Sequence, residues 1–142
     1  MLKKIILLLS AIITTNSFAH QLHHFDEVSK AALKGKNLHI TIDFSQCTGA
    51  TQSKTAPSLV GVFTPNEMQV SNNHIVTSFM HFTLNNPRFP NLPVYEFVTY
   101  NINNENNVIL TYQVLSAIDY SILSEKSSFS CKINASARIF SD

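Results

Sequence analysis

Apolar and polar side chains alternate along most of this chain, and a period of two residues predicts β-strands. The clearest stretch is 38–45, where Leu, Ile, Ile and Phe alternate with His, Thr, Asp and Ser. Residues 94–102 and 108–115 are two more such segments on either side of a polar, Asn-rich turn, and together they predict a hairpin. Further strands are expected at 59–63, 68–70, 74–84, 128–133 and 139–140.

The segment 20–36 departs from this period and predicts a polar tail followed by one helix. Its acidic residues come before its lysines, which suits the helix dipole, and Gly35 is placed to end the helix. The apolar residues that share one arc of the helical wheel are Leu22, Phe25, Val28, Ala32 and Leu33.

The order of these elements predicts an α+β fold. We expect one N-terminal helix followed by a mostly antiparallel rolled sheet or small barrel of seven to eight strands. The segment 85–93 contains three prolines and is expected to be irregular. Several predicted strands are shorter than the roughly 9–11 residues that a membrane-spanning strand needs, so an outer-membrane barrel is not expected.

The first 19 residues have the features of a secretory signal peptide. Lys3 and Lys4 form a basic start, and residues 5–13 are an apolar run too short to span a bilayer. Ser17 and Ala19 place small residues three and one positions before a cleavage site. We therefore expect 1–19 to be a signal peptide and 20–142 to be a single domain, located in the periplasm or outside the cell.

Charge and hydropathy narrow the possible partners. The chain has 10 Lys and Arg against 9 Asp and Glu, so the loss of Lys3 and Lys4 leaves eight basic and nine acidic residues. Such a near-neutral domain is not expected to bind nucleic acid. No second apolar run reaches about 18 residues, so no integral membrane segment is expected after signal cleavage.

Two cysteines, Cys47 and Cys131, lie in the expected mature domain. An even number of cysteines in an exported chain favours a disulfide, which would close a long loop and contribute roughly 4 kcal/mol of stability. The alternative is a pair of free thiols, one of them reactive. The wide spacing does not match a zinc or redox motif.

Histidines offer a candidate copper site. Cleavage after Ala19 would leave His20 with a free α-amine beside its imidazole, and these two nitrogens can chelate copper. A second imidazole, from His74 or His81, would complete a three-nitrogen site. The alternative is that the six histidines of the chain serve no common site.

Other polar residues suggest weaker possibilities. His39 and Asp43 lie on the polar face of one predicted strand and could form an acid–base couple or simply be solvated. Glu96 is in phase with apolar neighbours, so it is either buried or at a wet edge of the sheet. Arg88 and Phe89 lie between prolines, where they could form a contact surface or pin the loop to the core. The chain contains no nucleophile or phosphate-loop motif, so no catalytic residue is assigned.

Several stretches also resemble a known family. Residues 31–36 (Ala-Ala-Leu-Lys-Gly-Lys) and 38–47 (Leu-His-Ile-Thr-Ile-Asp-Phe-Ser-Gln-Cys) look like the opening of the VirK family of small exported bacterial proteins. The later stretches 75–84, 93–100, 129–133 and 138–140 fit the same family, so the resemblance covers nearly all of the expected mature chain. The region 49–73 departs from it by having few glycines.

The resemblance implies an exported, β-rich, disulfide-bearing domain. The family is named for virulence-associated loci of bacteria that colonise hosts. It brings no catalytic residues and no cofactor, and the only site it carries over is the pair Cys47 and Cys131.

Three functions are therefore compared. The first is a non-enzymatic, virulence-associated binding domain for a protein partner or a small apolar ligand, which would enter at the mouth of a barrel. The second is a periplasmic copper-binding protein that uses His20. The third is a small hydrolase whose site is assembled from scattered residues.

Overall fold

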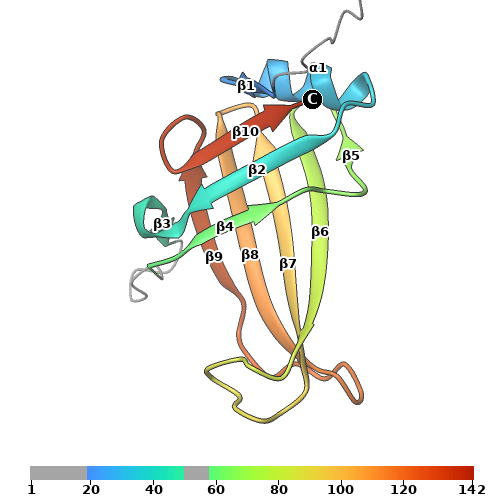
Figure 1. Ribbon diagram of the computed structural model, residues 1–142, viewed down its shortest axis with the longest axis vertical. Coiled ribbons are helices and arrows are strands. Elements are labelled where there is room, and N and C mark those ends of the chain that lie inside the picture. The colour runs from blue at the N-terminus through green and yellow to red at the C-terminus, as the bar shows by residue number, and fades with distance from the viewer. Residues whose placement is uncertain (1–18, 50–57) are drawn as a thin grey trace, which may run out of the picture.

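Two antiparallel β-sheets and one α-helix make up the described parts of the chain, residues 19–49 and 58–142 of a computed structural model (Figure 1). Of the predicted signal peptide, residues 1–18 lie outside the described parts. The predicted central hairpin is confirmed, since 94–103 and 107–116 pair over nearly their whole length.

The larger sheet has six strands in the order β3-β9-β8-β7-β6-β5. Its three central strands are ten residues long and pair without interruption. The strands are β3 (Thr48–Gly49), β5 (Gln69–Val70), β6 (His74–Thr83), β7 (Val94–Asn103), β8 (Asn107–Ser116) and β9 (Ser127–Lys132).

The smaller sheet has four strands in the order β1-β10-β2-β4 and crosses one end of the larger sheet (Figure 1). The predicted alternation in 38–43 holds, because every second residue of β2 is buried. The strands are β1 (His20–Leu22), β2 (Leu38–Asp43), β4 (Val60–Phe63) and β10 (Ala137–Ser141).

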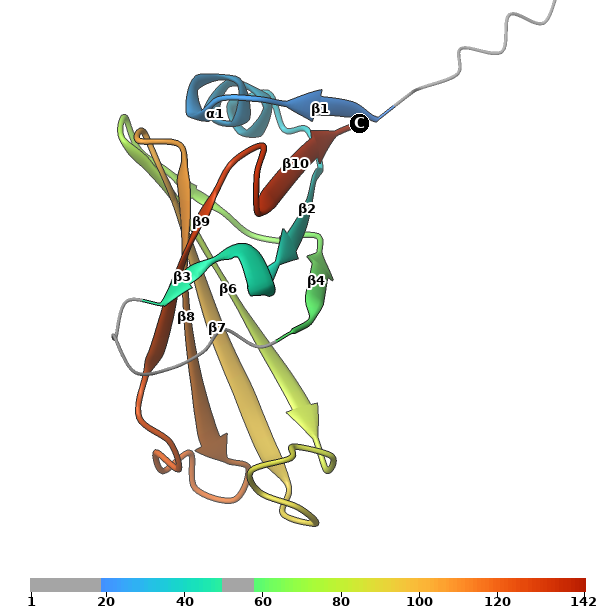
Figure 2. The same ribbon diagram turned by 90° about the vertical axis from the view of Figure 1, so that its left-hand side faces the viewer.

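The predicted helix is α1 (Phe25–Leu33), at the same end of the molecule as β1 (Figure 2). Phe25 and Val28 are buried as expected, but Leu33 is 72% exposed and lies outside the apolar arc. Gly35 ends the helical segment with a φ of +71°, a conformation that glycine adopts without steric cost. Among the described residues, no helix has the length and apolar character needed to cross a bilayer.

The core lies where the two sheets overlap. Ile40 and Ile139 of the smaller sheet and Ile75, Ile102 and Val108 of the larger sheet are all completely buried. Each of these residues belongs to the inward-facing set of its strand, so the period of two in the sequence places one face of each sheet in the core.

The expected rolled sheet or small barrel of seven to eight strands is wrong. The described residues form ten strands in two sheets that do not close into a barrel, and the protein is mostly β. Three strands, β1, β3 and β5, have only two or three residues and take their register from longer partners, so they carry little pattern of their own. No pairing joins β4 to β6 among the described strands, so both sheets keep free edges.

Candidate functional site

A cleft forms where the large sheet extends beyond the small one (Figure 2). We call residues 74–77, 100–103 and 107–110 the closed half of strands β6 to β8, and residues 78–83, 94–99 and 111–116 their open half. A cavity of about 520 Å³ lies at the boundary between the two halves. Its apolar lining is Phe44, Leu59, Pro87, Val98, Tyr100, Leu110 and Phe129.

Strand register explains why these side chains form one surface. Val98 pairs with Tyr112, and Tyr100 pairs with Leu110, which in turn pairs with Phe129 on β9. Directly paired residues project from the same face of a sheet, so all five point toward the smaller sheet. The cleft therefore has a continuous apolar floor across three strands.

A second cavity, of about 610 Å³, extends the cleft toward the edge strands β4 and β6. It shares Val98 and Tyr100 with the first cavity. Phe63 of β4 stacks on Tyr100 with ring centroids 3.8 Å apart and planes 18° from parallel. Burial raises the pKa of Tyr100 to about 12, so its hydroxyl stays neutral at physiological pH.

One hydrogen-bonded cluster supplies most of the polar character of the cleft. Asn86 is only 2% exposed, and its Nδ2 donates to Glu96 Oε1 (2.8 Å) and to Tyr112 Oη (3.0 Å). Asn86 Oδ1 accepts from the backbone N–H of Arg88 (2.9 Å). Burial, and then the nearby Glu96 carboxylate, raise the pKa of the Tyr112 hydroxyl. The cluster holds one carboxylate and two neutral polar groups in fixed positions beside an apolar surface.

The Pro-rich loop 85–93 is irregular as predicted and contributes to the cleft. Arg88 lines the cavity with an exposed side chain, whereas Phe89 is half-buried. Glu96 is half-buried on a central strand, between the two environments considered for it. Sequence reasoning singled out Arg88 and Glu96 but missed Asn86, whose only signal is its place before Pro87 in a loop rich in turn residues.

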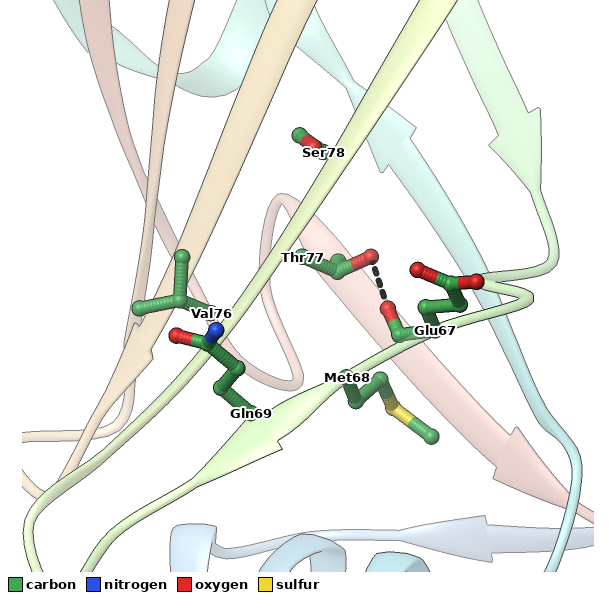
Figure 3. Close-up of a pocket in the computed structure, with 6 residues that line it drawn as sticks. All are labelled: Glu67, Met68, Gln69, Val76, Thr77 and Ser78. Carbon is green, nitrogen blue, oxygen red and sulfur yellow. Dashed lines mark hydrogen bonds between the residues drawn. The ribbon is translucent and has the colours of Figure 1, made fainter.

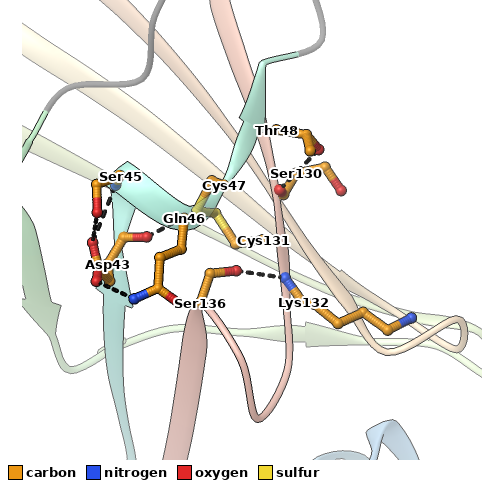
Figure 4. The surroundings of a disulfide bond; sticks show 9 residues. All are labelled: Asp43, Ser45, Gln46, Cys47, Thr48, Ser130, Cys131, Lys132 and Ser136. Atoms are coloured by element: carbon orange, nitrogen blue, oxygen red, sulfur yellow. Dashed lines mark hydrogen bonds between the residues drawn. A yellow bond between two sulfur atoms is a disulfide. The ribbon is translucent and has the colours of Figure 1, made fainter.

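Cys47 and Cys131 form the predicted disulfide (Figure 4). Cys131 is fully buried on β9, and Cys47 follows the short 3₁₀ helix Phe44–Gln46, so the bond ties the end of β2 to the large sheet. Beside it, Phe44 contacts Phe129 edge to face with centroids 6.1 Å apart. Because both rings line the cleft, the disulfide fixes one wall of the cavity.

Asp43 shapes the turn that carries Cys47. Its Oδ1 accepts from Ser45 Oγ (2.6 Å) and from the Ser45 N–H (3.1 Å), and its Oδ2 accepts from Gln46 Nε2 (2.6 Å) (Figure 4). These hydrogen bonds, that of the Ser45 hydroxyl first, lower the pKa of the Asp43 carboxyl. Asp43 is therefore a capping residue.

His39 does not pair with Asp43. Its Nε2 lies 2.9 Å from Asp142 Oδ1 and its Nδ1 lies 2.9 Å from Thr64 Oγ1. The proposed acid–base couple of His39 and Asp43 is therefore not formed.

The candidate copper ligands lie on different parts of the fold. His20 is on β1 of the smaller sheet, whereas His74 and His81 are on β6 of the larger one. Seven residues of strand separate His74 from His81, on the order of 23 Å, and this odd spacing points them to opposite faces. In residues 19–49 and 58–142, no three His, Cys, Asp or Glu side chains are grouped as a metal ion would require.

Comparison with known proteins places this fold. Residues 21–120 match the family model described as VirK protein. The structure is similar to the crystal structure of a VirK family protein from Legionella pneumophila, with a TM-score of 0.79 and 24% sequence identity. The match covers 86% of this chain and 99% of that one, and no curated protein matches the chain. The predicted resemblance is thus confirmed, and the chain belongs to the VirK family.

Proposed function

We propose that this chain is an exported, non-enzymatic VirK family domain that binds a small apolar ligand in the cleft between its two sheets. The observation that carries the proposal is the cavity of about 520 Å³ with an apolar floor and one buried polar cluster. Ligand sites in proteins typically have volumes of about 300–1,000 Å³, mostly apolar walls and a few well-placed polar groups.

The location in the cell is part of this proposal. The disulfide between Cys47 and Cys131 and the basic and apolar pattern of residues 1–19 both support export to the periplasm or beyond. The family name points to bacteria that colonise hosts, so we place the ligand in that setting.

The two kinds of lining suggest different roles in binding. Contact with Val98, Leu110 and Phe129 would provide most of the affinity, because burial of apolar surface gains roughly 25 cal/mol per Å². A ligand of about 25 heavy atoms, at about 0.3 kcal/mol per atom, would bind with a Kd on the order of micromolar. Glu96 and Asn86 would orient any polar end of the ligand.

The test is a fluorescence titration with N-phenyl-1-naphthylamine, a neutral apolar probe that brightens in apolar sites. We expect saturable binding, and we expect Val98→Lys to weaken it at least tenfold by placing a charge in the cleft. Leu33→Lys on α1 is the matched control, since Leu33 is 72% exposed and lies at the other end of the molecule. Equal binding by the two variants, both folded by circular dichroism, would rule out this cleft as the site.

A further inference from the structure

The part of β6 below β5 is an open sheet edge (Figure 1). β5 pairs with β6 only at Ile75 and Val76, yet β6 continues to Thr83. Among the described strands, no other strand pairs with residues 78–83 on that side. The backbone groups there are free to bind another strand.

The hydrogen bonds of the β5–β6 turn identify these backbone groups. The N–H of Ser71 donates to the carbonyl of His74 (2.9 Å), so the backbone of His74 points toward β5. On the other side, the N–H of Asn104 donates to the carbonyl of Asn73 (3.1 Å), so residue 73 points toward β7. Because strand residues alternate in direction, the N–H and C=O groups of Ser78, Met80 and Phe82 face the open edge.

This edge lacks the features that usually protect edge strands. Residues 77–83 (Thr-Ser-Phe-Met-His-Phe-Thr) contain no Lys, Arg, Asp, Glu or Pro, and their register with β7 has no bulge. Phe79, Met80 and Phe82 are 50%, 49% and 51% exposed. A neutral, apolar, regular edge of this kind favours pairing with another strand.

A cavity of about 290 Å³ marks the place where β5 leaves the edge (Figure 3). Its lining includes Glu67, Thr77 and Ser78, and Thr77 Oγ1 donates to the carbonyl of Glu67 (2.6 Å). This bond holds Glu67 beside the start of the open edge, with its carboxylate exposed and without an ion pair among the described residues. The edge therefore ends on a negative charge.

We propose that residues 78–82 of β6 bind an extended segment of a partner protein as an added antiparallel strand, with a lysine or arginine of that segment near Glu67. The open backbone groups select an extended peptide, and the cavity between β4 and β6 accepts its inward-facing apolar side chains. Charge complementarity favours a partner over a second copy, because residues 77–83 of a copy offer Glu67 no basic side chain.

The test uses the oxidised protein and a fluorescein-labelled heptapeptide, Thr-Val-Thr-Val-Thr-Val-Lys, followed by fluorescence anisotropy. In one version the three threonine amides are N-methylated, and in a second version the three valine amides are. Only alternate amides of an added strand point toward β6. We expect one version to lose at least tenfold in affinity and the other to stay within about threefold of the parent. Equal affinity of the two versions would overturn the proposal.

Two protein variants sharpen the test. Met80→Pro removes an N–H that points to the open edge and leaves the ladder with β7 intact, so we expect at least a tenfold loss of peptide affinity. Glu67→Gln should weaken the peptide two- to fivefold, with no change for a peptide that ends in Gln instead of Lys. If Glu67→Gln affects both peptides alike, the assigned orientation is wrong.

Amide hydrogen exchange in the unmodified protein covers the case in which Met80→Pro does not fold. Peptide binding should slow exchange at Ser78, Met80 and Phe82, whose amides face the edge, and leave Phe79 and His81 unchanged. A dimer of the protein alone that is broken by Met80→Glu would instead assign the edge to a second copy and would overturn the partner assignment.

Discussion

The two halves of the large sheet are built from the same three strands, but only one of them is sealed. In the closed half, Ile75, Ile102 and Val108 are completely buried beneath the smaller sheet. In the open half, Phe79 on the same face is 50% exposed, and Val98 is half-buried. The strands alternate apolar and polar residues in both halves, so the length of the smaller sheet decides which part becomes core and which part becomes cleft.

The far end of the open half is sealed again. Val94 and Val114 are completely buried there, and the backbone N–H of Leu123 donates to the carbonyl of Val114 (2.9 Å). The cleft therefore lies between two packed regions. Such a position allows an apolar surface to stay accessible while the strands that carry it remain rigid.

Removal of the disulfide should have the largest effect on this comparison, because the bond ties the smaller sheet to the larger one. We expect the double variant Cys47→Ser, Cys131→Ser to lose about 4 kcal/mol of unfolding free energy. Urea denaturation followed by circular dichroism measures it. A loss below about 1 kcal/mol would show that packing alone holds the two sheets together.

A matched pair of valines tests the difference between the halves directly. Val108→Ala in the closed half should cost about 2 kcal/mol, because it removes buried methyl groups and leaves a cavity. Val98→Ala in the open half should cost less than about 1 kcal/mol, since its side chain is half-exposed already. Equal losses in urea denaturation would mean that the cleft is packed as tightly as the core.

The polar cluster supports the open half. Asn86→Ala would leave the Tyr112 hydroxyl and the Glu96 carboxylate without their shared donor, and we expect a loss of about 1–2 kcal/mol. Asn85→Ala, at the exposed neighbouring position, is the control and should change stability by less than about 0.5 kcal/mol. Similar values for the two variants would assign the cluster no structural role.

Tyr100 lies at the boundary between the halves and predicts a small effect of pH. Its pKa is raised from 10.0 to about 12 by burial, so the folded state holds the proton more tightly than the unfolded state. Its contribution to stability is complete below pH 10 and is lost as pH rises through about 12. Tyr100→Phe should reduce the loss of stability between pH 10 and 12, measured by thermal melting. An unchanged pH profile would mean that the ring is not sealed by Phe63.

Much of this fold follows from the sequence. The alternation in 38–43, the hairpin of 94–103 and 107–116, and the inward orientation of Cys131 are all read from a period of two residues. The same period could not reveal the number of sheets or whether they close. That outcome depends on β1, β3 and β5, which are too short to carry a pattern.

The candidate site was harder to predict for a related reason. Met80 and Phe82 are as apolar as core residues, yet they lie on the outer face of β6, opposite to Ile75, and are about half exposed. Local pattern assigns residues to faces but does not say which face another sheet covers. The role of Asn86 depends on contacts with residues 10 and 26 positions away, which no local spacing encodes.

The most direct test of the central claim is a methyl NMR spectrum of the protein with and without N-phenyl-1-naphthylamine. If the open cleft is the ligand site, the probe will shift the methyl signals of Val98, Leu110 and Leu59, and those of Ile40, Ile139 and Val28 will stay in place. Shifts confined to Met80 and Leu84 on the outer face, or no shifts at saturating probe, would contradict it.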